Sequence, residues 1–190
     1  IEPVRIGIPR VDDALQSGLY PGSVLGLTGH EGSLKSSVAL HLIEENVWRN
    51  PACRCLFCSL DMNPDMLMHR RVSRFLGIHE VRARELFAEQ DADYIRARNE
   101  IARRDDGRLF VLSSPCSVAD IEIAMGTCLP SLCVIDYLLL VNVAGERDKF
   151  RAFERTLEKV REWRSTTKAT FVLLSQMSRA SKAEAKSGKS

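Results

Sequence analysis

One segment, TGHEGSLKSS at residues 28–37, places a lysine and a hydroxyl group at the spacing of a phosphate-binding loop. The pattern for such a loop is glycine, four residues, then glycine, lysine and serine or threonine. Gly29, Lys35 and Ser36 fit this pattern, whereas Leu34 stands where the second glycine belongs. In such a loop, backbone N–H groups surround the β-phosphate, the lysine reaches the β- and γ-phosphates, and the hydroxyl group holds Mg²⁺. The segment is therefore a candidate nucleotide site.

Leu34 is the departure from the pattern, because the usual glycine lets the backbone approach a phosphate without a Cβ atom. We expect a side chain here to be compatible with a nucleotide only if φ is negative and the side chain points away, with Gly32 supplying flexibility. The alternative is a serine-capped turn before a helix. An apolar strand before the loop and an amphipathic helix after it favour nucleotide binding. The candidate nucleotide-binding residues are Gly29, His30, Glu31, Gly32, Ser33, Leu34, Lys35, Ser36 and Ser37.

Two acidic residues close apolar segments further along the chain. Asp136 ends LCVID, and because burying an unpaired carboxylate is costly, we expect it to hold the water shell of Mg²⁺ opposite Ser36. Its alternative role is a helix cap or an ion pair. Asp61 ends LFCSLD and could orient and deprotonate an attacking water molecule. Its alternative role is to cap the helix at Pro64, a task that Asn63 could equally perform.

Gln176 ends the last apolar segment, ATFVLLSQ. An amide at this position can sense a γ-phosphate and transmit its presence to the following loop. The alternative is a solvated glutamine at the end of a strand. With Asp61, it is a candidate catalytic residue.

The elements that must position these residues alternate between strands and helices. Apolar strands are expected at 23–29, 53–60, 108–114, 131–141 and 169–176. Helices are expected over 35–50, from Asn63 and Pro64 through Arg74, over 81–105 as one or two helices, from Ser117 to about Thr127, and over 149–166. Fully apolar strands in this order predict an α/β fold with a mostly parallel, twisted sheet and helices on both faces. Ligands of such sheets bind at the carboxyl ends of the strands, where the loop, both acids and the glutamine would meet.

Bulk composition indicates an ordinary globular protein in the cytoplasm. The chain has 190 residues, of which 45% are apolar and 27% charged, with a net charge of +2. No apolar run is long enough for a membrane span, so no membrane contact is expected. The sequence begins at Ile1 without a signal peptide, so we expect it to be part of a longer protein.

Six cysteines lie in or beside apolar runs, where reduced thiols pack as small hydrophobic groups. Cys53, Cys55 and Cys58 are closely spaced and raise the alternative of a metal site. No second cysteine or histidine pair lies at ligand spacing, which favours buried thiols.

The C-terminal residues 177–190 form a segment of small and basic residues without apolar periodicity. We expect a mobile basic loop that contacts the backbone of single-stranded nucleic acid. The alternative is a solvated loop without a ligand. The candidate nucleic-acid-binding residues are Arg179, Lys182, Lys186 and Lys189.

Four segments together resemble the ATPase domain of DnaB-type replicative helicases: GLYPGSVLGLTGHEGSLKSSVAL, SLDMNPDMLMHRRVSRFLGI, VIDYLLLV and LLSQMSR. They occur in the family's order and cover roughly residues 5–180. The first segment alone would also fit RadA- or KaiC-like members of the wider RecA-like group.

The resemblance implies a RecA-like P-loop NTPase core, a single domain over residues 1–190, and a ring, usually hexameric, with ATP and Mg²⁺ between subunits. It implies translocation on single-stranded DNA by two loops that match residues 142–149 and 177–190. Lys35 and Ser36 match the Walker A pair, and Asp136 matches the Walker B acid.

By the same resemblance, Gln176 matches the strand-end glutamine, and Asp61 matches a catalytic acid that is normally glutamate. The family's arginine finger and final strands lie further along than this sequence runs, and the family's usual N-terminal domain is not in it. Two functions therefore remain: the motor domain of a DnaB-like helicase, or a RecA-like nucleotide-binding module that acts as a loader, recombination accessory or regulatory partner.

Overall fold

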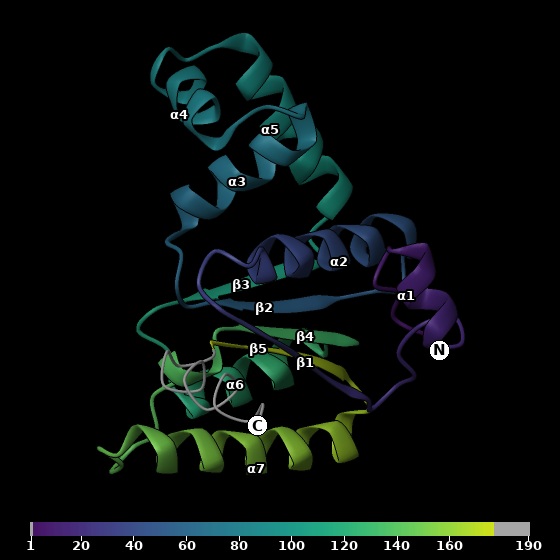
Figure 1. The fold of residues 1–190 in the computed structure, drawn as a ribbon, viewed down its shortest axis with the longest axis vertical. Helices are drawn as coiled ribbons and strands as arrows, with labels where there is room; N and C mark the ends of the chain where they lie inside the picture. Colours follow the sequence, from purple (N-terminus) through teal and green to yellow (C-terminus); the bar gives the residue numbers. More distant parts are fainter. Residues whose placement is uncertain (1, 177–190) are drawn as a thin grey trace, which may run out of the picture.

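The computed structural model describes residues 2–176, which contain a five-stranded parallel sheet in the order β1-β5-β4-β2-β3 (Figure 1). The strands are β1 (Val24–Gly29), β2 (Cys55–Ser59), β3 (Leu109–Ser113), β4 (Leu132–Asp136) and β5 (Thr170–Gln176). The helices are α1 (Pro9–Ala14), α2 (Lys35–Arg49), α3 (Pro64–Leu76), α4 (Glu80–Ala88), α5 (Ala92–Asp105), α6 (Val118–Cys128) and α7 (Lys149–Thr167).

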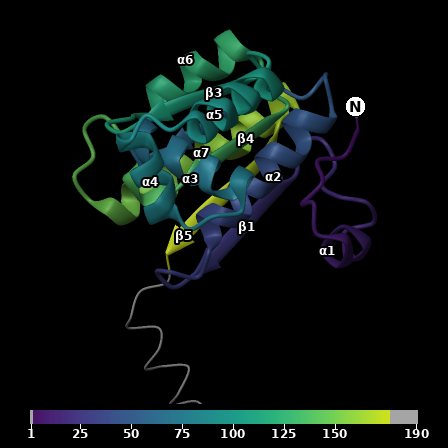
Figure 2. The same cartoon turned by 90° about the horizontal axis from the view of Figure 1, so that it is seen from above.

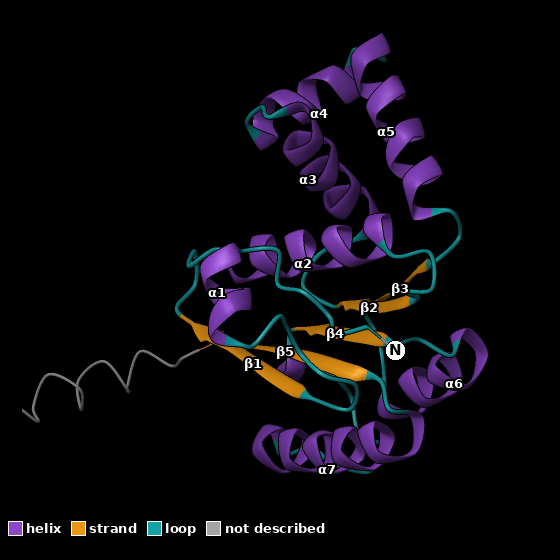
Figure 3. Ribbon diagram, turned by 90° about the vertical axis from the view of Figure 1, so that its right-hand side faces the viewer, coloured by secondary structure: helices purple, strands orange, loops and turns teal. Residues whose placement is uncertain are grey.

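The sheet is covered on both faces, as the apolar strands predict. Helix α2 covers one face, and α6 and α7 cover the other (Figures 1 and 3). Every residue of the central strands β2 and β4 is buried, and each face has its own cluster of buried apolar side chains. A strand that is apolar on both sides is stable only between two such layers, so the predicted α/β class is confirmed.

Local signals in the sequence fix several helix ends. The Asn63 side chain accepts a hydrogen bond of 2.8 Å from the Met66 N–H at the start of α3, next to Pro64 in the first turn. Ser117 and Asp120 form a reciprocal capping box at the start of α6. Both starts agree with the prediction.

Three expectations about the elements need correction or refinement. The apolar run at 131–141 is not one strand, because β4 ends at Asp136 and a 3₁₀ helix, η1 (Leu138–Leu140), follows. Leu138 and Val141 are still buried, so the apolar residues of this run indicate burial and do not by themselves indicate a strand. The charged segment 81–105 is a pair of helices. Helix α1 was not expected, since six residues are too few to show periodicity; it lies beside α2, away from α3–α5 (Figure 2).

Helices α3, α4 and α5, which the chain forms between β2 and β3, make a third layer above α2 (Figures 1 and 3). This helical layer has a buried apolar cluster of its own, to which all three helices contribute. The buried members are Val72, Ala83, Leu86, Tyr94, Ala97 and Ile101. Trp48 of α2 packs both against this cluster and against the cluster between α2 and the sheet, so apolar packing links the layer to α2.

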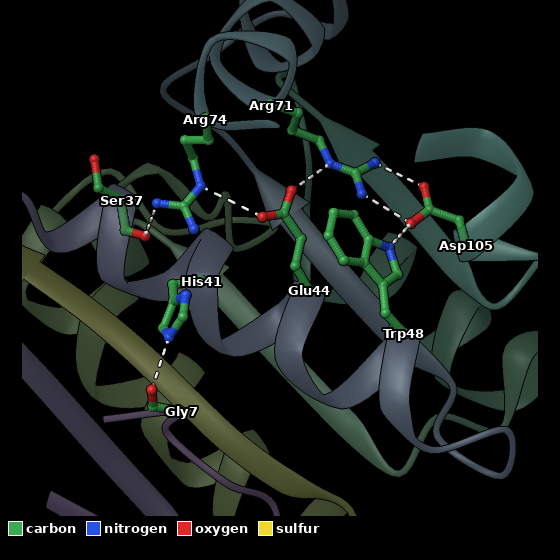
Figure 4. Close-up of polar contacts among 8 residues, drawn as sticks. All are labelled: Gly7, Ser37, His41, Glu44, Trp48, Arg71, Arg74 and Asp105. Carbon is green, nitrogen blue, oxygen red and sulfur yellow. Dashed lines mark hydrogen bonds and ion pairs between the residues drawn. The ribbon is translucent and has the colours of Figure 1, made fainter. Parts of the chain in front are cut away.

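Polar contacts, largely buried, also join the layer to α2 (Figure 4). Arg71 donates to Glu44 of α2 at 3.1 Å and forms a two-pronged pair with Asp105 at 2.7 and 2.8 Å. The Trp48 indole N–H also donates to Asp105, at 2.9 Å. Arg74 reaches the second Glu44 oxygen at 3.4 Å. Burial lowers the pKa of Arg71, but the Asp105 and Glu44 carboxylates outweigh it and raise that pKa overall.

All six cysteines are buried and free, and burial raises the pKa of the Cys53 and Cys55 thiols. Within residues 2–176, no group of three or more histidine, cysteine or acidic side chains is arranged to hold a metal ion. The helices of this part of the chain are each too short or too polar to cross a membrane.

Replacing Arg71 with alanine should destabilise the fold by about 3 kcal/mol, because it leaves buried carboxylates without their main counter-charge. Chemical unfolding in urea measures this. The matched control is Arg96→Ala on α5, whose side chain is 71% exposed and pairs only with Asp93 in the described part of the chain. The control should change stability by less than about 0.5 kcal/mol. Equal effects would mean that the buried pairs do not hold the layer.

Candidate nucleotide-binding site

The strand register brings the predicted polar residues to one edge of the sheet. Gly29 of β1 pairs with Gln176 of β5, and Ser59 of β2 pairs with Asp136 of β4. Asp61 follows Ser59 by two residues. At this edge lies a cleft of about 360 Å³. Its lining includes residues 31–37 together with Asp61, Asp136 and Gln176.

The loop between β1 and α2 is shaped as a cradle held by its own lysine. The Lys35 ammonium donates to the carbonyl oxygens of Gly29 and His30 at 2.8 and 2.7 Å. A Cβ atom on Gly29 would lie 2.6 Å from Ser33 Oγ, so the Ser33 hydroxyl would have to move to admit any other residue there. Gly32 has a φ of 76°, a left-handed conformation that glycine adopts readily and a residue with a side chain rarely adopts.

Leu34 does not meet the condition of a negative φ that we set for a side chain at this position. Its φ is 62° and its ψ is 16°, so the leucine adopts the left-handed conformation that the missing glycine would adopt. The side chain is 69% exposed. A leucine in this conformation carries backbone strain of about 1 kcal/mol, which the departure from glycine introduces into the loop.

Asp136 is almost fully buried, with 3% of its surface exposed, and its Oδ2 atom has no hydrogen-bond partner within residues 2–176. Burial raises the pKa of Asp136, while the neighbouring Ser36 hydroxyl lowers it. The Asp61 carboxylate raises the same pKa further, and Arg70 and Lys35 lower it. A raised pKa means that the ionised carboxylate is held at a cost, which a cation beside Oδ2 would offset. These residues therefore fit a hydrated Mg²⁺.

Asp61 is exposed at the mouth of the cleft and does not cap α3, since Asn63 performs that task. Its charge acts on Asp136, which places the two carboxylates close enough to interact. An uncommitted carboxylate beside the phosphate loop is available to accept a proton from water.

The cleft has a second wall that sequence reasoning missed. It includes Arg70, Ser73 and Arg74 of α3, Glu80 of α4, and Tyr137. Arg74 donates to the Ser37 carbonyl oxygen at 3.3 Å (Figure 4), and Arg70 pairs with Glu80 at 3.2 Å. The sequence signal was the spacing of the three α3 residues, which lie on one face of a helix at i, i+3 and i+4.

The predicted nucleic-acid residues Arg179, Lys182, Lys186 and Lys189 lie outside the described residues. Of the two segments matched to DNA-facing loops, 142–149 is described. Asn142 is hydrogen-bonded by its backbone to Cys116 and Val118, and Asp148 caps the start of α7.

A parallel sheet, a glycine-bearing loop with lysine and serine at the start of a helix, and a buried acid on a neighbouring strand define a P-loop NTPase with a RecA-like fold. The family model of the DnaB-like helicase C terminal domain matches residues 4–189. The chain therefore belongs to the DnaB-like helicase C terminal domain family, and the resemblance read from its motifs is confirmed. No curated protein sequence matches the chain.

Two solved structures share the fold. One is described as an ATPase domain; it is 16% identical in sequence with a TM-score of 0.80, and the match covers 96% of this chain and 66% of that one. The other, a DnaB-like replicative helicase described with its interactions with primase, is 15% identical with a TM-score of 0.80. That match covers 96% of this chain and 45% of the other. The chain thus spans less than two thirds of either.

Replacing Leu34 with glycine should raise the free energy of unfolding by about 0.5 kcal/mol, because glycine removes left-handed strain but loses more entropy on folding. Leu34→Ala is the matched control, since it keeps the Cβ atom and the strain. Thermal unfolding without nucleotide compares the two. If both substitutions change stability alike, the loop does not hold this residue in a left-handed conformation.

Proposed function

We propose that this chain is the ATP-binding and ATP-hydrolysing motor domain of a DnaB-like replicative DNA helicase that translocates on single-stranded DNA. The observation that carries the proposal is the cleft that the Lys35 loop shares with the buried Asp136, whose Oδ2 has no hydrogen-bond partner within residues 2–176. Family membership supplies the reaction class, nucleotide hydrolysis coupled to DNA unwinding.

In this proposal, the backbone N–H groups of residues 29–37 and the N-terminus of α2 bind the phosphates. The Lys35 ammonium exchanges its carbonyl partners for the β- and γ-phosphates. Ser36 and, through water, Asp136 would hold Mg²⁺, which would neutralise phosphate charge when bound.

The catalytic step is attack of water on the γ-phosphorus. Asp61 accepts the proton of that water, the new P–O bond forms, and ADP leaves with the electrons of the broken bond. Gln176 senses the γ-phosphate from the end of β5. Arg70, a cation in the same cleft whose charge already reaches Asp136, contacts the phosphates from the α3 side.

We further propose that the residues act as one domain in a homo-oligomeric ring, a hexamer, in the cytoplasm. The segments 142–149 and 177–190 would line its channel, with Arg179, Lys182, Lys186 and Lys189 on DNA phosphates. A ring places ATP between subunits, so turnover depends on assembly.

A nucleotide-binding module without motor activity is the alternative, which would act as a loader, recombination accessory or regulatory partner. It is favoured by the strained Leu34 and by the aspartate at position 61, one methylene shorter than the family's glutamate. ATP-dependent strand displacement separates the two functions, because a module of this kind binds nucleotide without separating strands.

Asp61→Asn should retain ATP binding and lose about 10²-fold or more in turnover, because an amide cannot accept the proton of the attacking water. Lys35→Ala is the contrasting variant and should lose about 2 kcal/mol or more of binding, since a charge-assisted phosphate contact disappears. A fluorescent ATP analogue measures binding, and phosphate release from ring-assembled protein measures turnover. Wild-type turnover in Asp61→Asn would exclude Asp61 as the base, and wild-type binding in Lys35→Ala would exclude the site.

Replacing Lys182 and Lys186 with alanine should flatten the slope of log affinity for single-stranded DNA against log salt by roughly one unit, because each neutralised phosphate contributes about −0.7. The matched control removes two charges from α5 by Arg96→Ala and Arg103→Ala, whose side chains are 71% and 72% exposed. Fluorescence anisotropy of ring-assembled protein at several salt concentrations gives both slopes. A slope that stays unchanged in the lysine variant would remove 177–190 from the DNA-binding surface.

A further inference from the structure

One carboxylate in the nucleotide cleft has no place in the mechanism above. Glu80 is the first residue of α4, and its side chain lines the cleft together with Lys35 and Ser36. It is 22% exposed. A carboxylate near bound phosphates is unfavourable unless cations neutralise it, so its contacts decide its role.

Both oxygens of Glu80 are held by arginines. Arg70 Nε donates to Oε2 at 3.2 Å, and Arg84 Nη2 donates to Oε1 at 2.7 Å. The two arginines lower the pKa of Glu80 against the opposing effect of its partial burial, so the side chain is a carboxylate at neutral pH. Arg84 alone keeps Glu80 neutralised if Arg70 leaves.

Arg70 interacts with carboxylates on both sides of the cleft. Its guanidinium is bound to Glu80, yet its charge also lowers the pKa of Asp136 on the opposite side of the cleft. The side chain is 29% exposed, and within residues 2–176 the bond to Glu80 is its one side-chain hydrogen bond. Its terminal nitrogens thus remain available to a ligand in the cleft.

We propose that Glu80 is a positioning residue that restrains Arg70 and competes with nucleotide phosphates for it. This inference rests on the proposed ATP site and adds an internal competitor to it. When a triphosphate binds, Arg70 passes from Glu80 to the phosphates, and Arg84 retains Glu80. Occupancy of the cleft thereby loosens the link between α3 and the start of α4. By reciprocity, whatever strengthens the pair of Arg70 and Glu80 weakens nucleotide binding.

The test measures the affinity of fluorescent ATP and ADP analogues with Mg²⁺ for the wild type and for Glu80→Gln. Releasing Arg70 should raise ATP affinity about fivefold, the scale of one charge interaction near a protein surface. ADP should gain less, since it presents fewer phosphate oxygens. The matched control is Glu85→Gln on the same helix, whose carboxylate pairs with Arg82 at 3.0 Å and should leave affinity unchanged.

A second arm determines whether Glu80 acts through Arg70. In an Arg70→Ala background, Glu80→Gln should no longer change ATP affinity by more than about twofold, because the contested cation is gone. If the gain persists there, simple repulsion by Glu80 explains it and the competition is wrong. Unchanged or weaker ATP binding in Glu80→Gln alone would also overturn the proposal.

Failure of this inference is separable from failure of the proposed function. If Lys35→Ala loses ATP binding and Glu80→Gln does not raise ATP affinity, the restraint of Arg70 by Glu80 is excluded and the proposed ATP site is kept. If Lys35→Ala binds ATP normally, the proposed ATP site is excluded, and the proposed role of Glu80 is excluded with it. Thermal unfolding of Glu80→Gln and Glu85→Gln checks that both variants fold alike, so that the affinity change cannot arise from a damaged helix.

Discussion

The parallel pairing of five strands is the constraint on which the other features depend. Parallel strands direct all their carboxyl ends to one edge, so residues that are far apart in sequence meet there. The pairing of Gly29 with Gln176 and of Ser59 with Asp136 fixes how far each of these residues lies along the strand direction. A register slip of one residue would turn Asp136 to the other face of the sheet and remove the cation position.

The cleft concentrates the unfavourable features of the fold. Leu34 has a left-handed backbone, and Asp136 holds a buried carboxylate oxygen that nothing in the described residues satisfies. Both are costs to stability that binding of a cation and phosphates can offset, since the ligand supplies the missing charge and contacts. In the proposed function, stability without ligand and affinity for nucleotide are therefore opposed at this edge.

The helical layer connects the cleft to the rest of the molecule. Arg71 joins α3 to Glu44 of α2 and to Asp105 of α5, while Arg74 and Arg70, on the same helix, line the candidate nucleotide cleft. One helix thus joins a rigid ionic anchor to two side chains exposed to the ligand. Because Arg70 is also bound to Glu80, the proposed competition for Arg70 would connect the cleft to α4.

The sequence by itself determined the α/β class, nearly all strands and helices, and the phosphate loop, because these depend on local periodicity, capping and a short motif. It also suggested Asp136 and Asp61, since each ends an apolar segment of the sequence. The tertiary structure alone decided that Leu34 is left-handed, that the run after Asp136 leaves the sheet, and that α3 and α4 form the second wall of the cleft. These depend on contacts between residues distant in sequence, such as Arg70 with Glu80 across a helix–helix corner, which no local pattern encodes.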